Sequence, residues 1–156
     1  ALIRENASRL RLTNLTARRR DALEKDKARR EQADVLLCDL PCSGLGIIRR
    51  KQDIKYRVTE KDLPELAALQ RRILAASVPC LKPGGILIYS TCTIDRLENE
   101  ENLLYIEKEL GMIPEEISGL LPAGIPGIRR NAIQLLPHIH GTDGFFVARF
   151  RKPFAQ

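Results

Sequence analysis

Two short cysteine motifs, about fifty residues apart, carry the side chains of this chain that are best suited to chemistry. Cys42 follows Pro41 and precedes a Ser-Gly-Leu-Gly run, and Cys92 lies within Ser-Thr-Cys-Thr. A cysteine thiolate is a strong nucleophile, and a covalent intermediate divides one difficult step into easier ones. Glycine and proline beside the thiols favour close contact with a substrate. The two motifs therefore predict covalent chemistry.

Each motif directly follows an apolar run that is typical of a buried strand. These runs are Val35–Cys38, before Asp39, and Ile86–Tyr89, before the Thr-Cys motif. In an open parallel sheet the carboxyl ends of the strands form the ligand crevice. We therefore expect both thiols to reach one crevice from neighbouring strand ends.

The remaining pattern predicts strand and helix in alternation, followed by a hairpin. Helical spacing at residues 1–11 and 62–81 indicates two helices, the second started by Thr59-x-x-Asp62 and stopped by Lys82-Pro83-Gly84-Gly85. Further along we expect a strand over 15–20 ending at Asp21, a helix from the Asp95-x-x-Glu98 capping box to Leu110, a loop over 112–131, and strands over 132–136 and 145–150. This order predicts an α/β, Rossmann-like fold, in its later half, that ends in an antiparallel hairpin.

Composition limits the function classes. With 156 residues the chain forms at most one domain, and no apolar run approaches the ~18 residues of a membrane span. Four cysteines in a chain that can bury an apolar core without disulfides predict free thiols in a reducing, cytoplasmic compartment. Their spacing, with His138 and His140 far downstream, matches no zinc pattern, so no metal is expected. Cys38 and Cys80 lie in apolar runs and are expected to be inert core residues.

Charge is distributed unevenly. The net charge is +6 for the chain, +6 for residues 1–30, +4 for residues 49–61, and −6 for residues 95–116. Clustered basic segments favour a polyanion such as nucleic acid, although a solvated surface explains such runs equally well. The chain has three Tyr, four Phe and no Trp, so a stacking platform for single strands is not expected.

Several motifs, in one order, resemble the Fmu/Sun (Nol/Nop/Sun) family of RNA cytosine-5 methyltransferases. They are Asp39-x-Pro41-Cys42-Ser43-Gly44-x-Gly46, Asp53-Ile54-Lys55-Tyr56, Gln70-x-x-Ile73-Leu74, Lys82-Pro83-Gly84-Gly85, Ser90-Thr91-Cys92-Thr93 and Asp143-Gly144-Phe145-Phe146. The resemblance implies a methyltransferase fold, S-adenosylmethionine as cofactor and RNA as substrate. Within the family the motifs look most like the bacterial enzymes that act on 16S ribosomal RNA.

The resemblance also implies a role for each matching residue. Cys92 matches the nucleophile that attacks C6 of cytosine, and Cys42 matches the second cysteine, which assists product release. Asp39 matches an acid between cofactor and base. Asp21, Asp39 and Pro41 are expected to contact the cofactor.

The family's glycine-rich cofactor loop and ribose-binding acid have no counterpart before Asp21. Residues 1–156 are therefore expected to be a partial catalytic domain, without the first strands and the RNA-recruiting domain of the family. Such a piece should bind S-adenosylmethionine weakly. It should also leave a sheet edge beside Val35–Asp39, open to self-association or covered by the N-terminal segment.

Two other functions remain open at this point. A DNA cytosine-5 methyltransferase uses the thiol of a Pro-Cys motif as nucleophile, but the Glu-Asn-Val motif that should follow is absent here. A non-catalytic RNA-binding or assembly fragment would keep the fold without cofactor binding.

Overall fold

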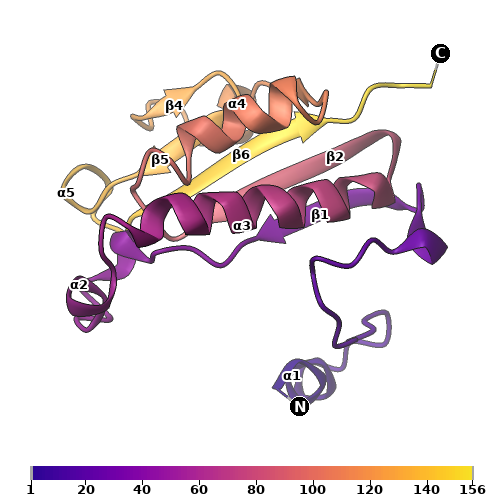
Figure 1. Ribbon diagram of the computed structural model, residues 1–156, viewed down its shortest axis with the longest axis horizontal. Coiled ribbons are helices and arrows are strands. Elements are labelled where there is room, and N and C mark those ends of the chain that lie inside the picture. Colours follow the sequence, from indigo (N-terminus) through magenta and orange to yellow (C-terminus); the bar gives the residue numbers. More distant parts are fainter. Residues whose placement is uncertain (1, 156) are drawn as a thin grey trace.

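The computed structural model describes residues 2–155 and contains one six-stranded mixed sheet in the order β1-β2-β6-β5-β4, with β3 paired to β6. Helices α3 and α4 run along one face of this sheet (Figure 1). The strands are β1 (Ala33–Asp39), β2 (Leu81–Thr91), β3 (Ile113–Pro114), β4 (Ile128–Arg129), β5 (Ala132–Leu135) and β6 (Phe145–Arg151). The helices are α1 (Leu2–Arg9), α2 (Ile54–Arg57), α3 (Asp62–Ser77), α4 (Glu100–Lys108) and α5 (Pro137–His140). The α/β, Rossmann-like class expected from the sequence is confirmed.

The core lies between the sheet and helices α3 and α4. Alternation along β2 and β6 turns every second side chain toward the helices, as the period of a strand requires. Fully buried members of the core are Leu74, Leu81, Leu87, Ile106 and Phe150. Burying one such side chain contributes about 1.5–3 kcal/mol.

Strand pairing agrees with the sequence prediction at the two motifs and at the hairpin. β1 and β2 are parallel, with Asp39 opposite Ser90, so both strands end at the same edge. β5 and β6 are antiparallel, and the short helix α5 fills the loop between them. The segment 112–131, expected to be loop, is mostly irregular but adds the two-residue strands β3 and β4.

The start of α3 agrees with the expected one, whereas the start of α4 does not. α3 begins at Asp62, whose carboxylate accepts from the amide and the hydroxyl of Thr59. Only this half of a capping box is formed, because the N-cap residue Lys61 provides no side-chain cap. Asp95 accepts from the amides of Leu97 and Glu98 instead, and α4 begins only at Glu100. The predicted capping role of Glu98 is wrong because its side chain turns into the protein interior.

The prediction that Lys82–Gly85 ends helix α3 is also wrong, because these residues lie within strand β2. α3 ends at Ser77, a 3-10 turn follows to Cys80, and β2 already begins at Leu81. Gly84 does adopt a positive φ of 77°, but it does so within the strand, where a side chain would collide with the ring of Phe154. The glycine is therefore required by close packing of the C-terminal segment.

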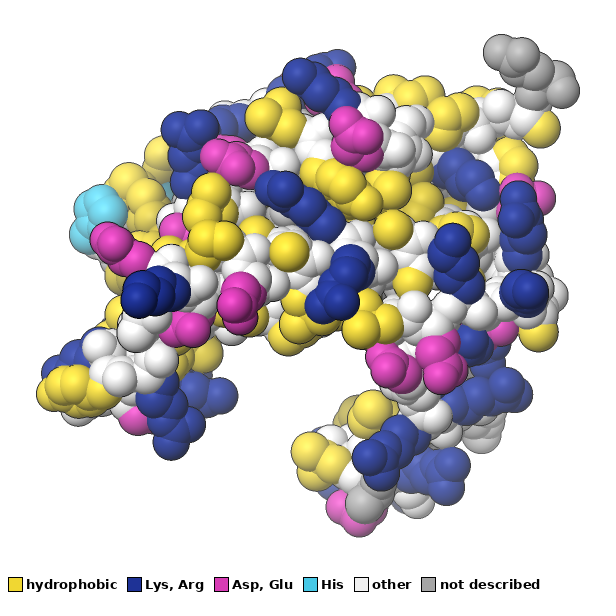
Figure 2. Space-filling model, viewed as in Figure 1, with side chains coloured by type: hydrophobic (Ala, Val, Ile, Leu, Met, Phe, Trp, Pro, Cys, Tyr) yellow, Lys and Arg dark blue, Asp and Glu magenta, His cyan; other side chains and the backbone are white. Residues whose placement is uncertain are grey.

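Two lobes extend from the sheet and leave a hollow between them. Figure 2 shows the lobe around α2 and the lobe around α1, both with many Lys and Arg side chains, and the hollow below the edge of β1. The segment 12–26 between α1 and the sheet contains no strand, so the strand predicted over 15–20 is wrong. The reason is the lack of a neighbour: Figure 1 shows this segment apart from the sheet, where no ladder can satisfy its backbone.

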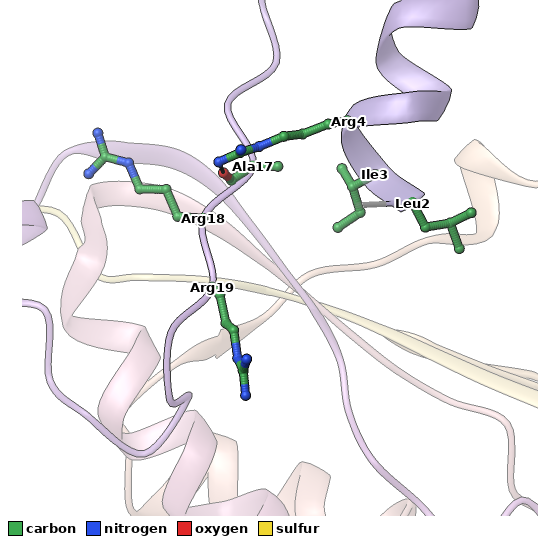
Figure 3. A pocket seen from close by; sticks show the side chains of 6 residues that line it. All are labelled: Leu2, Ile3, Arg4, Ala17, Arg18 and Arg19. Carbon is green, nitrogen blue, oxygen red and sulfur yellow. Dashed lines mark hydrogen bonds between the residues drawn. The ribbon is translucent and has the colours of Figure 1, made fainter.

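The lobe around α1 is held by few contacts. Figure 3 shows Arg4 reaching from α1 to the carbonyl of Ala17, to which its guanidinium donates over 3.3 Å. Leu2 and Ile3 beside it stay 71% and 61% exposed. The lobe therefore does not cover the sheet edge.

The β1 edge and the second face of the sheet at β1 are bare, whereas residues 117–125 lie over that face at β2, β5 and β6. Val35 and Leu37, on the side away from the helices, are 61% and 65% exposed. The accessible surface of the chain is 10449 Å², whereas a monomer of 17.6 kDa is expected to have ~7900 Å². The excess is as large as the surface buried in an obligate interface.

We predict that the chain self-associates through this edge and that Leu37→Lys abolishes the association. An unpaired strand edge with exposed apolar side chains pairs with other chains, and lysine on an edge prevents such pairing. Light scattering over a concentration series measures the mass, and Leu104→Lys on α4, where the leucine is 51% exposed, is the matched control. A wild-type chain that stays monomeric at the highest concentration would contradict the prediction.

Candidate active site

The parallel ends of β1 and β2 bring the two predicted cysteines together. The Sγ atoms of Cys42 and Cys92 are 3.2 Å apart, and the backbone N–H of Cys92 donates to Sγ of Cys42 over 3.3 Å. Both residues are partly exposed, so a substrate has access to the pair. Two thiols within contact distance can divide nucleophilic attack and proton transfer between them.

Glycine contacts hold the Pro-Cys loop in place. The amide of Gly46 donates to the carbonyl of Cys92 over 3.0 Å, and the amide of Gly144 donates to the carbonyl of Gly46 over 2.8 Å. A Cβ on Gly46 would lie 2.2 Å from the carbonyl oxygen of Gly144, which no side chain tolerates. Gly46 is therefore required for the loop, β2 and β6 to meet at the cysteines.

Asp39 and Pro41 occupy the same edge. The hydroxyl of Ser90 donates to Oδ1 of Asp39 over 3.0 Å, and the amide of Leu40 donates to the carbonyl of Ser90. Asp39 and Pro41 are exposed. Asp39 lies on the same bare face of β1 as Val35 and Leu37, because side chains two residues apart in a strand point to the same face. These residues lie where a ligand in the hollow would meet the end of β1.

Asp21 is not part of this group. It lies in the segment that stands apart from the sheet, is exposed, and accepts a hydrogen bond of 2.9 Å from the amide of Leu23. The strand that should have placed it at the sheet edge is absent from the described residues. Of the predicted site residues, the structure assembles Cys92, Cys42, Asp39 and Pro41, whereas Asp21 lies elsewhere.

A buried polar cluster beneath the Pro-Cys loop was missed by the sequence analysis. Its members, all fully buried, are Gln70, Glu98 and Asn102 together with the ring of Tyr89. Asn102 donates to Oε1 of Gln70 over 2.7 Å, and the hydroxyl of Tyr89 donates to the carbonyl of Glu98. A signal was present, since Gln70 is a polar residue on the apolar face of α3 and Glu98 closely follows the Thr-Cys motif.

The environment of Cys42 favours its protonated form. Burial raises the pKa of the Cys42 thiol to about 12, and the hydrogen bond and the charge of Cys92 add to this rise. Burial likewise raises the pKa of Cys38 to about 12, in keeping with an inert core thiol, whereas Cys80 is half-buried rather than a core residue. At neutral pH Cys42 is therefore a thiol that can donate a proton.

The basic loop, residues 49–61, borders the site. Asp143 pairs with Arg50 over 2.5 Å and with Arg49 over 3.8 Å, so the Asp-Gly motif fixes the start of the loop. Both arginine side chains remain about 70% exposed. His140 contacts the carbonyl of Pro126 through Nε2 over 2.9 Å, and this contact indicates a structural role.

Neither a metal centre nor a membrane helix is found in the described part of the chain. Within residues 2–155 no cluster of three or more His, Cys, Asp or Glu side chains is arranged to hold an ion. None of the helices in that range has the length and apolar character needed to cross a bilayer.

Comparison with known proteins finds similarity along nearly the whole chain. The sequence profile of the family described as "16S rRNA methyltransferase RsmB/F" matches residues 1–151. Probable ribosomal RNA small subunit methyltransferase B of Bacillus subtilis is 43% identical over 155 residues, which cover 97% of this chain and 35% of that protein. Ribosomal RNA small subunit methyltransferase F of Citrobacter koseri is 36% identical over 162 residues, 99% of this chain and 33% of that protein.

The fold has close structural relatives as well. The crystal structure of NSun6 from Pyrococcus horikoshii with SFG matches with a TM-score of 0.76 and 34% identity, covering 96% of this chain and 38% of that one. The chain thus spans about a third of the length of the curated relatives it matches.

We predict that Cys42 alkylates slowly in the folded chain. Only the thiolate reacts with iodoacetamide, so its rate should rise about tenfold per pH unit and continue to rise above pH 10. Cys92→Ala removes the side-chain hydrogen bond and the charge that raise the pKa of Cys42, and should shift the profile to lower pH without abolishing the effect of burial.

Mass spectrometry of the Cys42 peptide measures these rates, and the same peptide in urea provides the unshifted profile. A folded-state profile that coincides with the profile in urea would disprove the assignment.

Proposed function

This chain belongs to the 16S rRNA methyltransferase RsmB/F family, and we propose that it is the catalytic part of an enzyme that methylates C5 of cytosine in 16S ribosomal RNA. The family resemblance noted in the motifs is thereby confirmed, including the likeness to small subunit methyltransferase B. The observation that carries the proposed chemistry is the 3.2 Å contact between Cys42 and Cys92 at adjacent strand ends. A ribosomal RNA substrate also implies action in the cytoplasm.

We assign the nucleophilic role to Cys92. C5 of cytosine is a weak nucleophile, and addition of a thiolate to C6 forms the C6–S bond while the electron pair moves to C5. Bound S-adenosylmethionine supplies the electrophilic sulfonium methyl group that C5 attacks. Asp39 stabilises the ring by hydrogen bonding to N3 or the exocyclic amine as charge develops. The target base must leave its stack to reach the thiols.

We assign the release step to Cys42. While Cys92 is a free thiolate, its charge and hydrogen bond help to keep Cys42 protonated. Once Cys92 is a thioether in the adduct, its charge is gone and the pKa of Cys42 falls, while burial, the largest cause of the raised pKa, remains. Cys42 then loses its proton to solvent, removes the proton from C5, and the C6–S bond breaks to return Cys92 as a thiolate.

The DNA-type alternative reverses these roles and makes the Pro-Cys thiol the nucleophile. A thiol with a pKa raised to about 12 by burial is poorly suited to attack, which supports Cys92 instead. A non-catalytic RNA-binding fragment remains the second candidate function, since only part of the expected cofactor set is assembled here. Calorimetry with S-adenosylmethionine on the parent enzyme separates it from the catalytic function.

Two of the three residues expected to contact the cofactor suit that role. Asp39 and Pro41, exposed at the end of β1, fit a role in holding the cofactor. Asp21 does not fit, because it stands apart and already accepts from the amide of Leu23. The solved relative NSun6 was crystallised with SFG, an analogue of S-adenosylmethionine. We infer that this chain contributes one side of the cofactor site and binds the cofactor weakly by itself.

We predict that Cys42→Ala in the intact parent enzyme accumulates a covalent RNA adduct, whereas Cys92→Ala forms none. Without Cys42 the C6–S bond forms but is not broken, and without Cys92 it never forms. A denaturing gel with radiolabelled RNA detects the adduct, and Cys80→Ser should behave as the wild type. The reverse pattern would favour the DNA-type mechanism.

We predict that the basic loop contacts the RNA backbone. Replacing Arg49, Arg50 and Lys51 with Ala should weaken binding and flatten the slope of log affinity against log salt by about two to three units, because fewer counterions are released. Lys108→Ala, in the acidic region at the end of α4, is the control. An unchanged slope in the triple variant would assign RNA binding to another surface.

A further inference from the structure

The peptide groups on both sides of Cys42 are held by two buried side chains that no role in the chemistry explains. Oε2 of Glu98 accepts from the amide of Ser43 over 3.0 Å. Nε2 of Gln70 donates to the carbonyl of Pro41 over 3.0 Å. The same Nε2 donates to Oε2 of Glu98 over 2.7 Å, which joins the two contacts into one clamp across Cys42.

The clamp is itself fixed from behind. Oε1 of Gln70 accepts from Asn102 over 2.7 Å, and Oδ1 of Asn102 accepts from Nε of Arg71 over 2.8 Å. Glu98 and Gln70 are 0% exposed. Neither side chain can therefore change its position without breaking several buried hydrogen bonds.

Stability alone does not account for a carboxylate at this place. Oε1 of Glu98 is buried and has no hydrogen-bond partner among the described residues, and an unpaired buried polar atom is unfavourable. An apolar residue would avoid that penalty but would provide no acceptor for the amide of Ser43. The arrangement is thus explained by a requirement on the position of the Pro-Cys loop.

A third contact connects the clamp to the other cysteine. The hydroxyl of Ser43 lies 2.7 Å from the hydroxyl of Thr93, the residue after Cys92. A shift of the Ser43 peptide would therefore move Cys42 relative to Cys92.

We propose that Glu98 and Gln70 are positioning residues that hold the Cys42 thiol against Cys92 by fixing the peptide groups on either side of Cys42. Their importance for product release rests on the proposed function, whereas the spacing of the sulfurs does not. What matters in Glu98 is an acceptor oxygen at a fixed distance, because the two donors use only Oε2. Glutamine should therefore replace Glu98, and aspartate, which keeps the charge but is one methylene shorter, should not.

The test is cross-linking of the two thiols by dibromobimane in the folded chain, without RNA or cofactor. Each thiolate displaces one bromide, and the bridge closes only when the sulfurs lie a few ångströms apart. The background is Cys80→Ser, which removes the half-buried thiol outside the site. The variants are Glu98→Gln, Glu98→Asp and Gln70→Leu, with Glu107→Gln on α4 as the control.

Bridging should slow by at least about tenfold in Glu98→Asp and in Gln70→Leu, since a displacement near one ångström is enough to reduce an oriented reaction strongly. Glu98→Gln and Glu107→Gln should stay close to the wild-type rate. Alkylation of Cys92 by iodoacetamide should be the same in all variants, which distinguishes a moved Cys42 from general loosening. A wild-type bridging rate in Glu98→Asp or in Gln70→Leu, or a slow rate in Glu98→Gln, would overturn the proposal.

In the intact parent enzyme, Glu98→Asp should slow adduct release and leave adduct formation unchanged. Slow bridging in Glu98→Asp, together with no adduct in Cys42→Ala, would refute the proposed function and leave the positioning role standing. Unchanged release in a variant whose bridging is slow would refute the link between the clamp and catalysis.

Discussion

The parallel pairing of β1 with β2 is the constraint on which the site depends. Because Asp39 lies opposite Ser90, the Pro-Cys and Thr-Cys loops leave the sheet at the same edge and at the same level. A register shift of one residue would turn Asp39 and the following loop to the other face of the sheet. The contacts of Gly46 with Cys92 and Gly144 then attach β6 to the same point, so three strand ends meet around the two sulfurs.

Elements that depend on neighbouring residues in the sequence could be predicted, whereas elements that depend on tertiary contacts could not. The strands before Cys42 and Cys92 and the final hairpin follow from apolar runs and turn residues, and they were predicted correctly. Asp95-x-x-Glu98 matched a local capping pattern, but burial beneath the Pro-Cys loop decided the position of Glu98. The prediction of a strand over 15–20 was wrong because this segment, although its local pattern suits a strand, has no neighbouring strand to pair with.

The bare face of the sheet has a physical consequence for the molecule. A doubly wound sheet carries helices on both faces, whereas here α3 and α4 cover only one. Val35 and Leu37 thus remain exposed on the same side of β1 as Asp39. The surface that is open to association and the surface that would meet a cofactor are continuous, so whatever covers the sheet also bounds the ligand site.

The close approach of the two sulfurs also limits the charge that the site can hold. Two thiolates 3.2 Å apart in a partly buried edge would repel each other strongly, so at most one of the pair is ionised. Burial is the largest cause of the raised pKa of Cys42, and the hydrogen bond and the charge of Cys92 add to it. In the mechanism proposed above, adduct formation would remove the charge of Cys92 and so make ionisation of Cys42 easier, while the effect of burial remains. The short distance between the thiols would then favour attack before release, and the buried hydrogen bonds on both sides of Cys42 are the contacts that we propose to hold that distance.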